Sequence, residues 1–124
     1  MTSNADIPSR SMSAVRAGDK AGWLALFEHD AVVEDPVGGH AALDPTGEGQ
    51  RGIEAIAKFY DIFSAGQEAF DFEIVHVAAC GNEVACFALF TMTMQGGMQH
   101  KQNMIVVYRI SSAGRIASLR AFWN

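Results

Sequence analysis

Apolar and polar residues alternate along much of the second half of the chain, which is typical of strands that bury one face. Turn residues separate these segments: Gly81 with Asn82, Gly96 with Gly97, and the stretch SSAG. Glycine permits the positive φ that two-residue hairpins need. We therefore predict four long antiparallel strands, with the sequences FDFEIVHVAAC, EVACFALFTMTM, QHKQNMIVVYRI and RIASLRAFW.

The first half of the chain shows the spacing of amphipathic helices instead. Pro8 suits the first turn of a helix through PSRSMSAVRAG, and Gly18 is placed to end that helix. Asp19 can cap a second helix, in DKAGWLALFEHD, by accepting hydrogen bonds from the free amides of its first turn. A third helix is predicted in RGIEAIAKFYDIF, whose apolar face comprises Ile53, Ile56, Tyr60 and Phe63.

A short strand is predicted in AVVED, before the third helix. Pro36 ends this strand because proline lacks the amide hydrogen of the ladder, so Asp35 lies at the strand end. Asp44, in the second Asp-Pro pair of the glycine-rich loop that follows, is interpreted as a turn residue. Together these segments predict a single α+β domain over residues 1–124, with three N-terminal helices on one face of a curved, mostly antiparallel sheet.

The charge balance narrows the possible partners. The chain has 14 acidic and 9 basic residues, a formal net charge of -5, and its basic residues are scattered, so we expect no nucleic-acid partner. The longest apolar run, Val84 to Phe90, has seven residues, and the N-terminus lacks the charged and apolar regions of a signal peptide. We therefore expect a cytoplasmic protein without a membrane partner.

The cysteines and histidines give no sign of a metal site. Cys80 and Cys86 have no further thiol or imidazole at zinc-ligand spacing, and we interpret them as ordinary apolar side chains. No two histidines lie at the spacing that places two ligands on one helix face. The four histidines are His29, His40, His76 and His100. We predict no metal and no cofactor.

Three blocks of the chain carry a resemblance to a known family. AGDKAGWLALFEHDAVVEDPVG, RGIEAIAKFY and the closing GRIASLRAFW resemble blocks of the Δ5-3-ketosteroid isomerases, which are members of the nuclear transport factor 2-like (polyketide cyclase-like) superfamily. The resemblance covers nearly the whole chain and is most specific in VEDP and AFW. It implies a cone-shaped fold in which the sheet wraps around the helices and leaves a deep apolar pocket.

The resemblance implies a catalytic role for Asp35, which falls at the position of the family's proton-shuttling aspartate. Moving a double bond into conjugation with a ketone requires a base that takes a proton beside the carbonyl and returns it two carbons away. An aspartate base paired with an oxyanion hole is the established arrangement in ketosteroid isomerases. Asp35 is therefore the predicted base.

This chain lacks the family's hydrogen-bond donors at the two positions that align with the oxyanion hole. Where the family has a tyrosine on the first helix and a protonated acid on the third long strand, this chain has Ser11 and Val106. Valine donates no hydrogen bond, and a serine hydroxyl is shorter and less acidic than a phenol. Loss of one such donor typically raises the barrier by roughly 2.7–4 kcal/mol, so an efficient isomerase needs a substitute.

Strand parity and the resemblance name candidates for that substitute and for the pocket wall. Because alternate residues of a strand share a face, Gln102 and His100 lie on the side of Val106, and Gln102 can donate through its amide. Tyr60 aligns with a tyrosine that supports the oxyanion donor in the bacterial steroid isomerases, and it is the other candidate donor. The predicted catalytic residues are thus Asp35, Tyr60 and Gln102. Predicted to line the pocket are Phe59, His100, Met104, Val106, Ala117, Leu119, Ala121 and Trp123.

Three functions remain open at this point. The first is a steroid Δ-isomerase-like enzyme that acts on a flat apolar ketone. The second is a binding protein that holds a lipophilic small molecule without turnover, since a cavity survives the loss of oxyanion donors. The third is another chemistry of the superfamily, such as dehydration, epoxide opening or aldol cyclisation. In each case the partner is a small apolar molecule, and we expect a homodimer formed through the open sheet face.

Overall fold

A six-stranded sheet with the order β2-β1-β6-β5-β4-β3 forms the framework of the protein. The computed structural model describes residues 3–124. The strands are β1 (Phe27–Glu34), β2 (Gln50–Arg51), β3 (Gln67–Cys80), β4 (Glu83–Met94), β5 (Gln99–Ile110) and β6 (Ile116–Phe122). The helical segments are the 3-10 turn η1 (Asn4–Asp6), α1 (Ile7–Arg16), α2 (Lys20–Leu24) and α3 (Ile53–Ser64). Strands β1 and β6 pair in parallel, and the other pairs are antiparallel.

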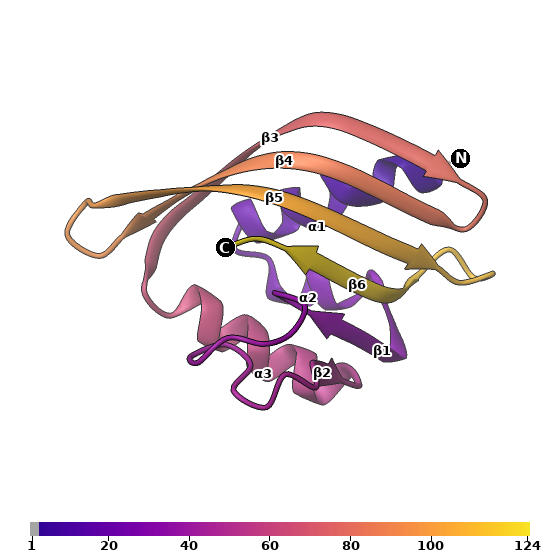
Figure 1. Ribbon diagram of the computed structural model, residues 1–124, viewed down its shortest axis with the longest axis horizontal. Helices are drawn as coiled ribbons and strands as arrows, with labels where there is room; N and C mark the ends of the chain where they lie inside the picture. Colours follow the sequence, from indigo (N-terminus) through magenta and orange to yellow (C-terminus); the bar gives the residue numbers. More distant parts are fainter. Residues whose placement is uncertain (1–2) are drawn as a thin grey trace.

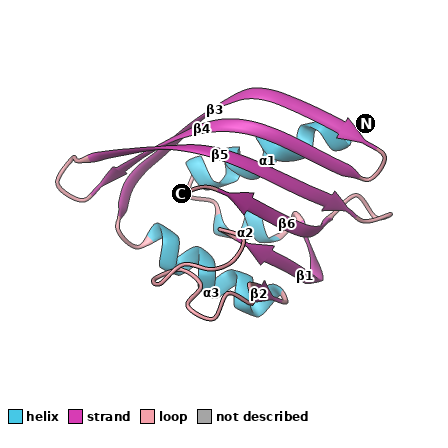
Figure 2. Ribbon diagram, in the orientation of Figure 1, coloured by secondary structure: helices cyan, strands magenta, loops and turns pink. Residues whose placement is uncertain are grey.

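The helices lie on the concave side of the sheet, as the α+β prediction requires (Figure 2). Strands β3, β4 and β5 arch over α1, while α3 packs against β1 and β2 at the other end of the sheet (Figure 1). In β5, Met104, Val106 and Tyr108 are buried and the intervening Ile105 is exposed. The predicted alternation is therefore confirmed in this strand, and its inner side chains face the helices.

The predicted second helix is too long. Asp19 caps α2 as expected, accepting from the Gly22 amide at 2.9 Å, but the helix ends at Leu24 and the chain is already a strand at Phe27. Phe27 pairs with Ile116 of β6, and the Ile116 amide donates to the Leu26 carbonyl at 2.8 Å. This pairing with a strand at the far end of the chain overrides the local helical spacing.

Other boundaries differ by a few residues. Strand β3 begins at Gln67, three residues before the predicted Phe70. Gly96 and Gly97 both adopt positive φ, of 92° each, but they lie in a four-residue loop between Met94 and Gln99 and not in a two-residue hairpin. The Gly81 turn, by contrast, joins Cys80 directly to its partner Glu83 through two residues, as predicted.

Candidate active site

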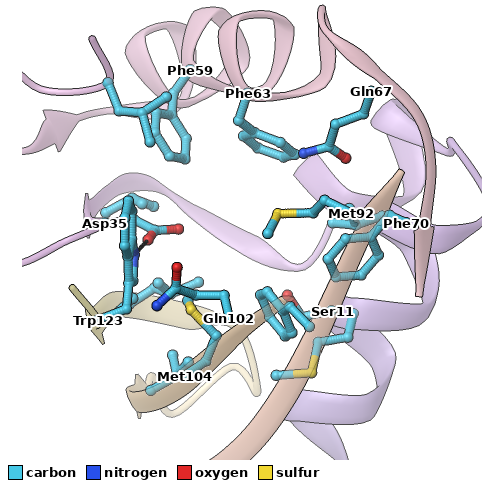
Figure 3. A pocket seen from close by; sticks show the side chains of 18 of the residues that line it. Ser11, Asp35, Phe59, Phe63, Gln67, Phe70, Met92, Gln102, Met104 and Trp123 are labelled. Carbon is cyan, nitrogen blue, oxygen red and sulfur yellow. Dashed lines mark hydrogen bonds between the residues drawn. The ribbon is translucent and has the colours of Figure 1, made fainter. Parts of the chain in front are cut away.

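A cavity of about 400 Å³ lies between the helices and the concave face of the sheet, with side chains of α1, α3 and the strands in its wall (Figure 3). Its volume falls in the range of small-molecule sites, roughly 300–1,000 Å³. Most of the wall is apolar and much of it is aromatic or sulfur-containing, including Phe59, Phe63, Phe70, Phe90, Met92, Met94 and Met104. Such a wall suits a bulky apolar ligand.

Asp35 is the acidic residue of this wall. It follows the last residue of β1, and the Trp123 indole Nε1 donates a hydrogen bond to its Oδ1 at 2.6 Å (Figure 3). Burial raises the pKa of the Asp35 carboxyl, and the hydrogen bond from Trp123 lowers that pKa to a smaller extent. Trp123 occupies one carboxylate oxygen, so the other is available for proton transfer.

The parallel pairing of β1 and β6 brings Asp35 to Trp123. Glu34 lies opposite Arg120 in this pair, and beyond the strand end the Val37 amide donates to the Ala121 carbonyl at 2.8 Å. The backbone on both sides of Asp35 is therefore fixed, and its side chain is directed toward the cavity.

Gln102 and His100 form a polar group in the cavity wall. His100 Nε2 and Gln102 Oε1 are 3.2 Å apart, and Gln102 Nε2 donates to the carbonyl of Asn124 at 3.0 Å. Both residues line the cavity, as strand parity predicted. The Gln102 amide is partly engaged with the chain end, so it is a weaker candidate for a donor to a ligand than its position alone suggests.

Tyr60 lies outside the cavity wall. It is buried in the core, where its ring packs against Trp23 and Phe63 with centroid distances of 5.6 and 5.0 Å. Trp23 and Phe63 themselves line the cavity, so Tyr60 stands behind them. The turn of α3 directs Phe59 toward the cavity and the adjacent Tyr60 toward α2, and this placement does not support the predicted contact of Tyr60 with a ligand.

The remaining predicted wall residues are found in the wall, with one exception. The cavity is lined by Phe59, Met104, Val106, Leu119, Ala121 and Trp123. Ala117 is the exception, because the β5–β6 register shifts between Arg109 and Ile110 and the buried positions of β6 are Ile116, Leu119 and Ala121. Strict alternation fails across such an irregularity.

Three residues of the cavity wall form a group that the sequence interpretation did not connect. Trp23 Nε1 donates to Ser11 Oγ at 3.1 Å, and the Ser11 hydroxyl lies beside the Tyr108 side chain. Burial raises the pKa of Tyr108 strongly, the nearby Cys86 and Asp35 raise it further, and the hydrogen bond with Ser11 lowers it. Tyr108 lies two residues beyond Val106, so the parity that selected Gln102 and Met104 also selects Tyr108.

The glycine-rich loop closes one side of the site. The His40 ring lies 5.5 Å from the Trp123 ring, and Leu43 contributes to the cavity wall. Asp44 is buried and its Oδ2 accepts from the Gly49 amide at 3.0 Å, which confirms that it is a turn residue.

The thiols are not part of this site. Cys86 is buried next to Val106, and burial raises its pKa to about 11, so the thiol stays protonated at neutral pH. Within residues 3–124, no group of three His, Cys, Asp or Glu side chains is arranged to hold a metal ion. None of the helices described is both long enough and apolar enough to cross a membrane.

Comparison with known proteins identifies the family. The family model described as the SnoaL-like domain matches residues 9–119. A steroid Delta-isomerase of Nocardioides simplex is 32% identical over 115 residues, which cover 93% of this chain and 85% of the relative. The chain therefore belongs to the SnoaL-like domain family.

Solved structures agree with this assignment. The Δ5-3-ketosteroid isomerase from Mycobacterium sp. matches with a TM-score of 0.88 at 32% identity, covering 99% of this chain and 95% of that one. A Mycobacterium tuberculosis protein in complex with estradiol-17beta-hemisuccinate matches with a TM-score of 0.87 at 31% identity and the same coverage. The fold is thus the nuclear transport factor 2-like fold of the ketosteroid isomerases, and the resemblance seen in the sequence is confirmed.

Proposed function

We propose that this protein is a ketosteroid isomerase-like enzyme that moves a proton next to the ketone of a flat apolar substrate, with Asp35 as the base. The observation that supports this most directly is the partly buried Asp35 carboxyl, held by Trp123 at the wall of an apolar cavity. The similarity to a steroid Delta-isomerase supports the class of reaction. The estradiol derivative bound to a similar protein supports a steroid as the ligand.

In this proposal the free oxygen of Asp35 removes a proton from the carbon between the carbonyl and the double bond. The electron pair of the broken C–H bond forms a new double bond to the carbonyl carbon, and the carbonyl π pair moves onto oxygen to give a dienolate. Asp35 then returns the proton to the far carbon of the original double bond, and the C=O bond forms again. A raised carboxyl pKa brings the base closer to neutrality, where a proton is both taken and returned readily.

The other wall residues hold the substrate in this proposal. Phe59, Met104 and Leu119 contact the flat apolar rings, and Val106 and Ala121 leave room for them. His100 and Gln102 contact a polar group at one end of the ligand. Tyr60 supports Trp23 and Phe63 from behind.

The test is the formation of a conjugated enone from a Δ5-3-ketosteroid, followed by ultraviolet absorbance. We expect Asp35→Asn to reduce kcat by about 10²- to 10⁴-fold, because that is the usual contribution of a positioned general base. Glu34→Gln is the matched control: it removes a carboxylate one residue away that pairs with Arg120 and does not line the cavity, and it leaves kcat unchanged. Equal rates for wild type and Asp35→Asn would sink the proposal.

A second function, ligand binding without turnover, is favoured by Ser11 and Val106 at the positions of the family's donors. Under this alternative a steroid raises the melting temperature of the protein while no enone forms over long incubation. Thermal shifts and product analysis on the same samples separate the two functions.

We also infer that the protein forms a homodimer through the outer face of the sheet. Phe87, Ile105 and Phe122 are cross-strand neighbours on this face, and all three are exposed. Exposed apolar patches of this kind are typical of interaction surfaces. The cytoplasmic location stays a prediction from the sequence.

A further inference from the structure

The buried group formed by Trp23, Ser11 and Tyr108 offers an unused hydroxyl hydrogen to the cavity. All three residues line the cavity, and their exposed fractions are 3%, 4% and 2%. Trp23 Nε1 donates to Ser11 Oγ at 3.1 Å, and the Ser11 hydroxyl lies beside the Tyr108 phenol, whose pKa it lowers. The two hydroxyls hold two hydrogens, and a hydrogen bond between them uses only one. The second hydrogen is therefore available to a ligand.

The direction of the hydrogen bonds from Trp23 through Ser11 to Tyr108 decides which residue carries the available hydrogen. An indole N–H only donates, so Trp23 is the first donor of the series and occupies a lone pair of Ser11. Accepting this bond makes the Ser11 hydroxyl a better donor, because successive hydrogen bonds polarise one another. The favoured order is thus Trp23 to Ser11 to Tyr108, and the terminal hydrogen belongs to Tyr108. Since a phenol is more acidic than a serine hydroxyl, the hydrogen left for the ligand is the stronger donor of the two.

We propose that Tyr108 donates a hydrogen bond to the carbonyl oxygen of the bound ligand, and that Ser11 and Trp23 are positioning residues that orient its hydroxyl. The catalytic part of this inference rests on the proposed function. Tyr108 lies two residues from Val106 on the same face of β5 and contacts Ser11, so it supplies a donor beside both positions where the family's donors are lacking.

The placement of Tyr108 relative to Asp35 fits the proton transfer. Asp35 and Ser11 project into the cavity from different sides (Figure 3). A ketone whose oxygen reaches the Ser11–Tyr108 pair thus directs its ring carbons toward Asp35. Negative charge that develops on the oxygen is then stabilised by a preorganised donor in an apolar cavity, where such a hydrogen bond is strongest.

Infrared difference spectra of a bound 3-keto-4-ene steroid, labelled with ¹³C at the carbonyl, test the hydrogen bond without turnover. We expect the carbonyl stretch in the wild-type complex to lie below its value in an apolar solvent. It should move back toward that value in Tyr108→Phe and only part of the way in Ser11→Ala. Ser13→Ala is the matched control, because Ser13 lies two residues from Ser11 on α1 but outside the cavity wall, and it should leave the stretch unchanged.

The kinetic readout is a decrease in kcat of about 10²- to 10³-fold in Tyr108→Phe, the usual effect of removing one oxyanion donor, with a much smaller change in KM. If Tyr108→Phe is unfolded by circular dichroism, the partial shift in Ser11→Ala decides the question.

Three results overturn the inference: an unchanged carbonyl stretch in Tyr108→Phe, a larger shift in Ser11→Ala than in Tyr108→Phe, or no binding of the enone to the wild-type protein. An unchanged stretch together with Asp35-dependent isomerisation rejects only the donor. A Tyr108-dependent stretch in a protein that never isomerises rejects the proposed reaction and leaves the donor supported.

Discussion

Trp123 donates its indole hydrogen to Asp35 at 2.6 Å, across 88 positions of sequence. Both side chains line the cavity, and each is partly buried. The bond orients the carboxyl and stabilises its charged form, while the surrounding apolar wall destabilises that form. Burial has the larger effect, so the pKa of Asp35 is raised overall.

Removing this hydrogen bond should move the pH dependence of the reaction. In Trp123→Phe the pKa of Asp35 rises further, because the contact that lowers it is lost. In the proposed reaction Asp35 acts as a carboxylate, so we expect activity above the Asp35 pKa and its loss as the pH falls through that pKa. We expect the acid limb of a plot of kcat/KM against pH to shift to higher pH in Trp123→Phe. An acid limb that stays in place would show that Asp35 is not the titrating base; Glu34→Gln serves as the unshifted control.

The raised pKa also predicts how stability depends on pH. The folded pKa of Asp35 lies above the unfolded one, so its contribution to stability is fully present below the ordinary pKa of 3.8 and is lost as the pH rises through the folded pKa. Asp35→Asn has no titrating carboxyl at this position and therefore does not lose stability in this way as the pH rises. We expect the variant to have a higher free energy of unfolding than wild type at neutral pH, and the difference to shrink in acid. Denaturant titrations at a series of pH values measure it, and a variant less stable at neutral pH would contradict the prediction.

Sequence patterns predicted the features that depend on local order. Alternation along one strand was enough to place Gln102, Met104 and Val106 on the inner face, and Tyr108 follows by the same rule. The strand at Phe27 was missed because it depends on pairing with Ile116, far away in the chain.

The contacts within the site depend on how separate elements pack, and here the sequence was less informative. Tyr60 and Phe59 are neighbours on α3, and only the rotation of that helix against α2 decides which of them reaches the cavity. The hydrogen bond from Trp123 to Asp35 likewise requires the parallel pairing of β1 and β6. No periodicity along one segment encodes either contact.

Restoring an acid at Val106 should increase activity. A carboxyl at this buried position is held protonated by its apolar surroundings, and it can then donate to an enolate as the corresponding acid does in ketosteroid isomerases. We expect Val106→Asp to raise kcat by roughly 10-fold or more while losing about 1–3 kcal/mol of stability for the buried polar group. Val107→Asp is the matched control, since Val107 lies outside the cavity wall. Equal or lower kcat in a folded Val106→Asp protein would contradict the prediction.

The outer sheet face predicts the state of association. Ile105 stands between its cross-strand neighbours Phe87 and Phe122, with 52% of its surface exposed. An acid placed there must be desolvated on association without a partner charge, so we expect Ile105→Asp to be monomeric where wild type is dimeric. Met98→Asp is the control, because Met98 is 75% exposed in the loop between β4 and β5, away from this patch. Sedimentation equilibrium over a range of concentrations measures the masses. A wild-type monomer at high concentration, or an Ile105→Asp protein that still dimerises, would refute pairing through this face.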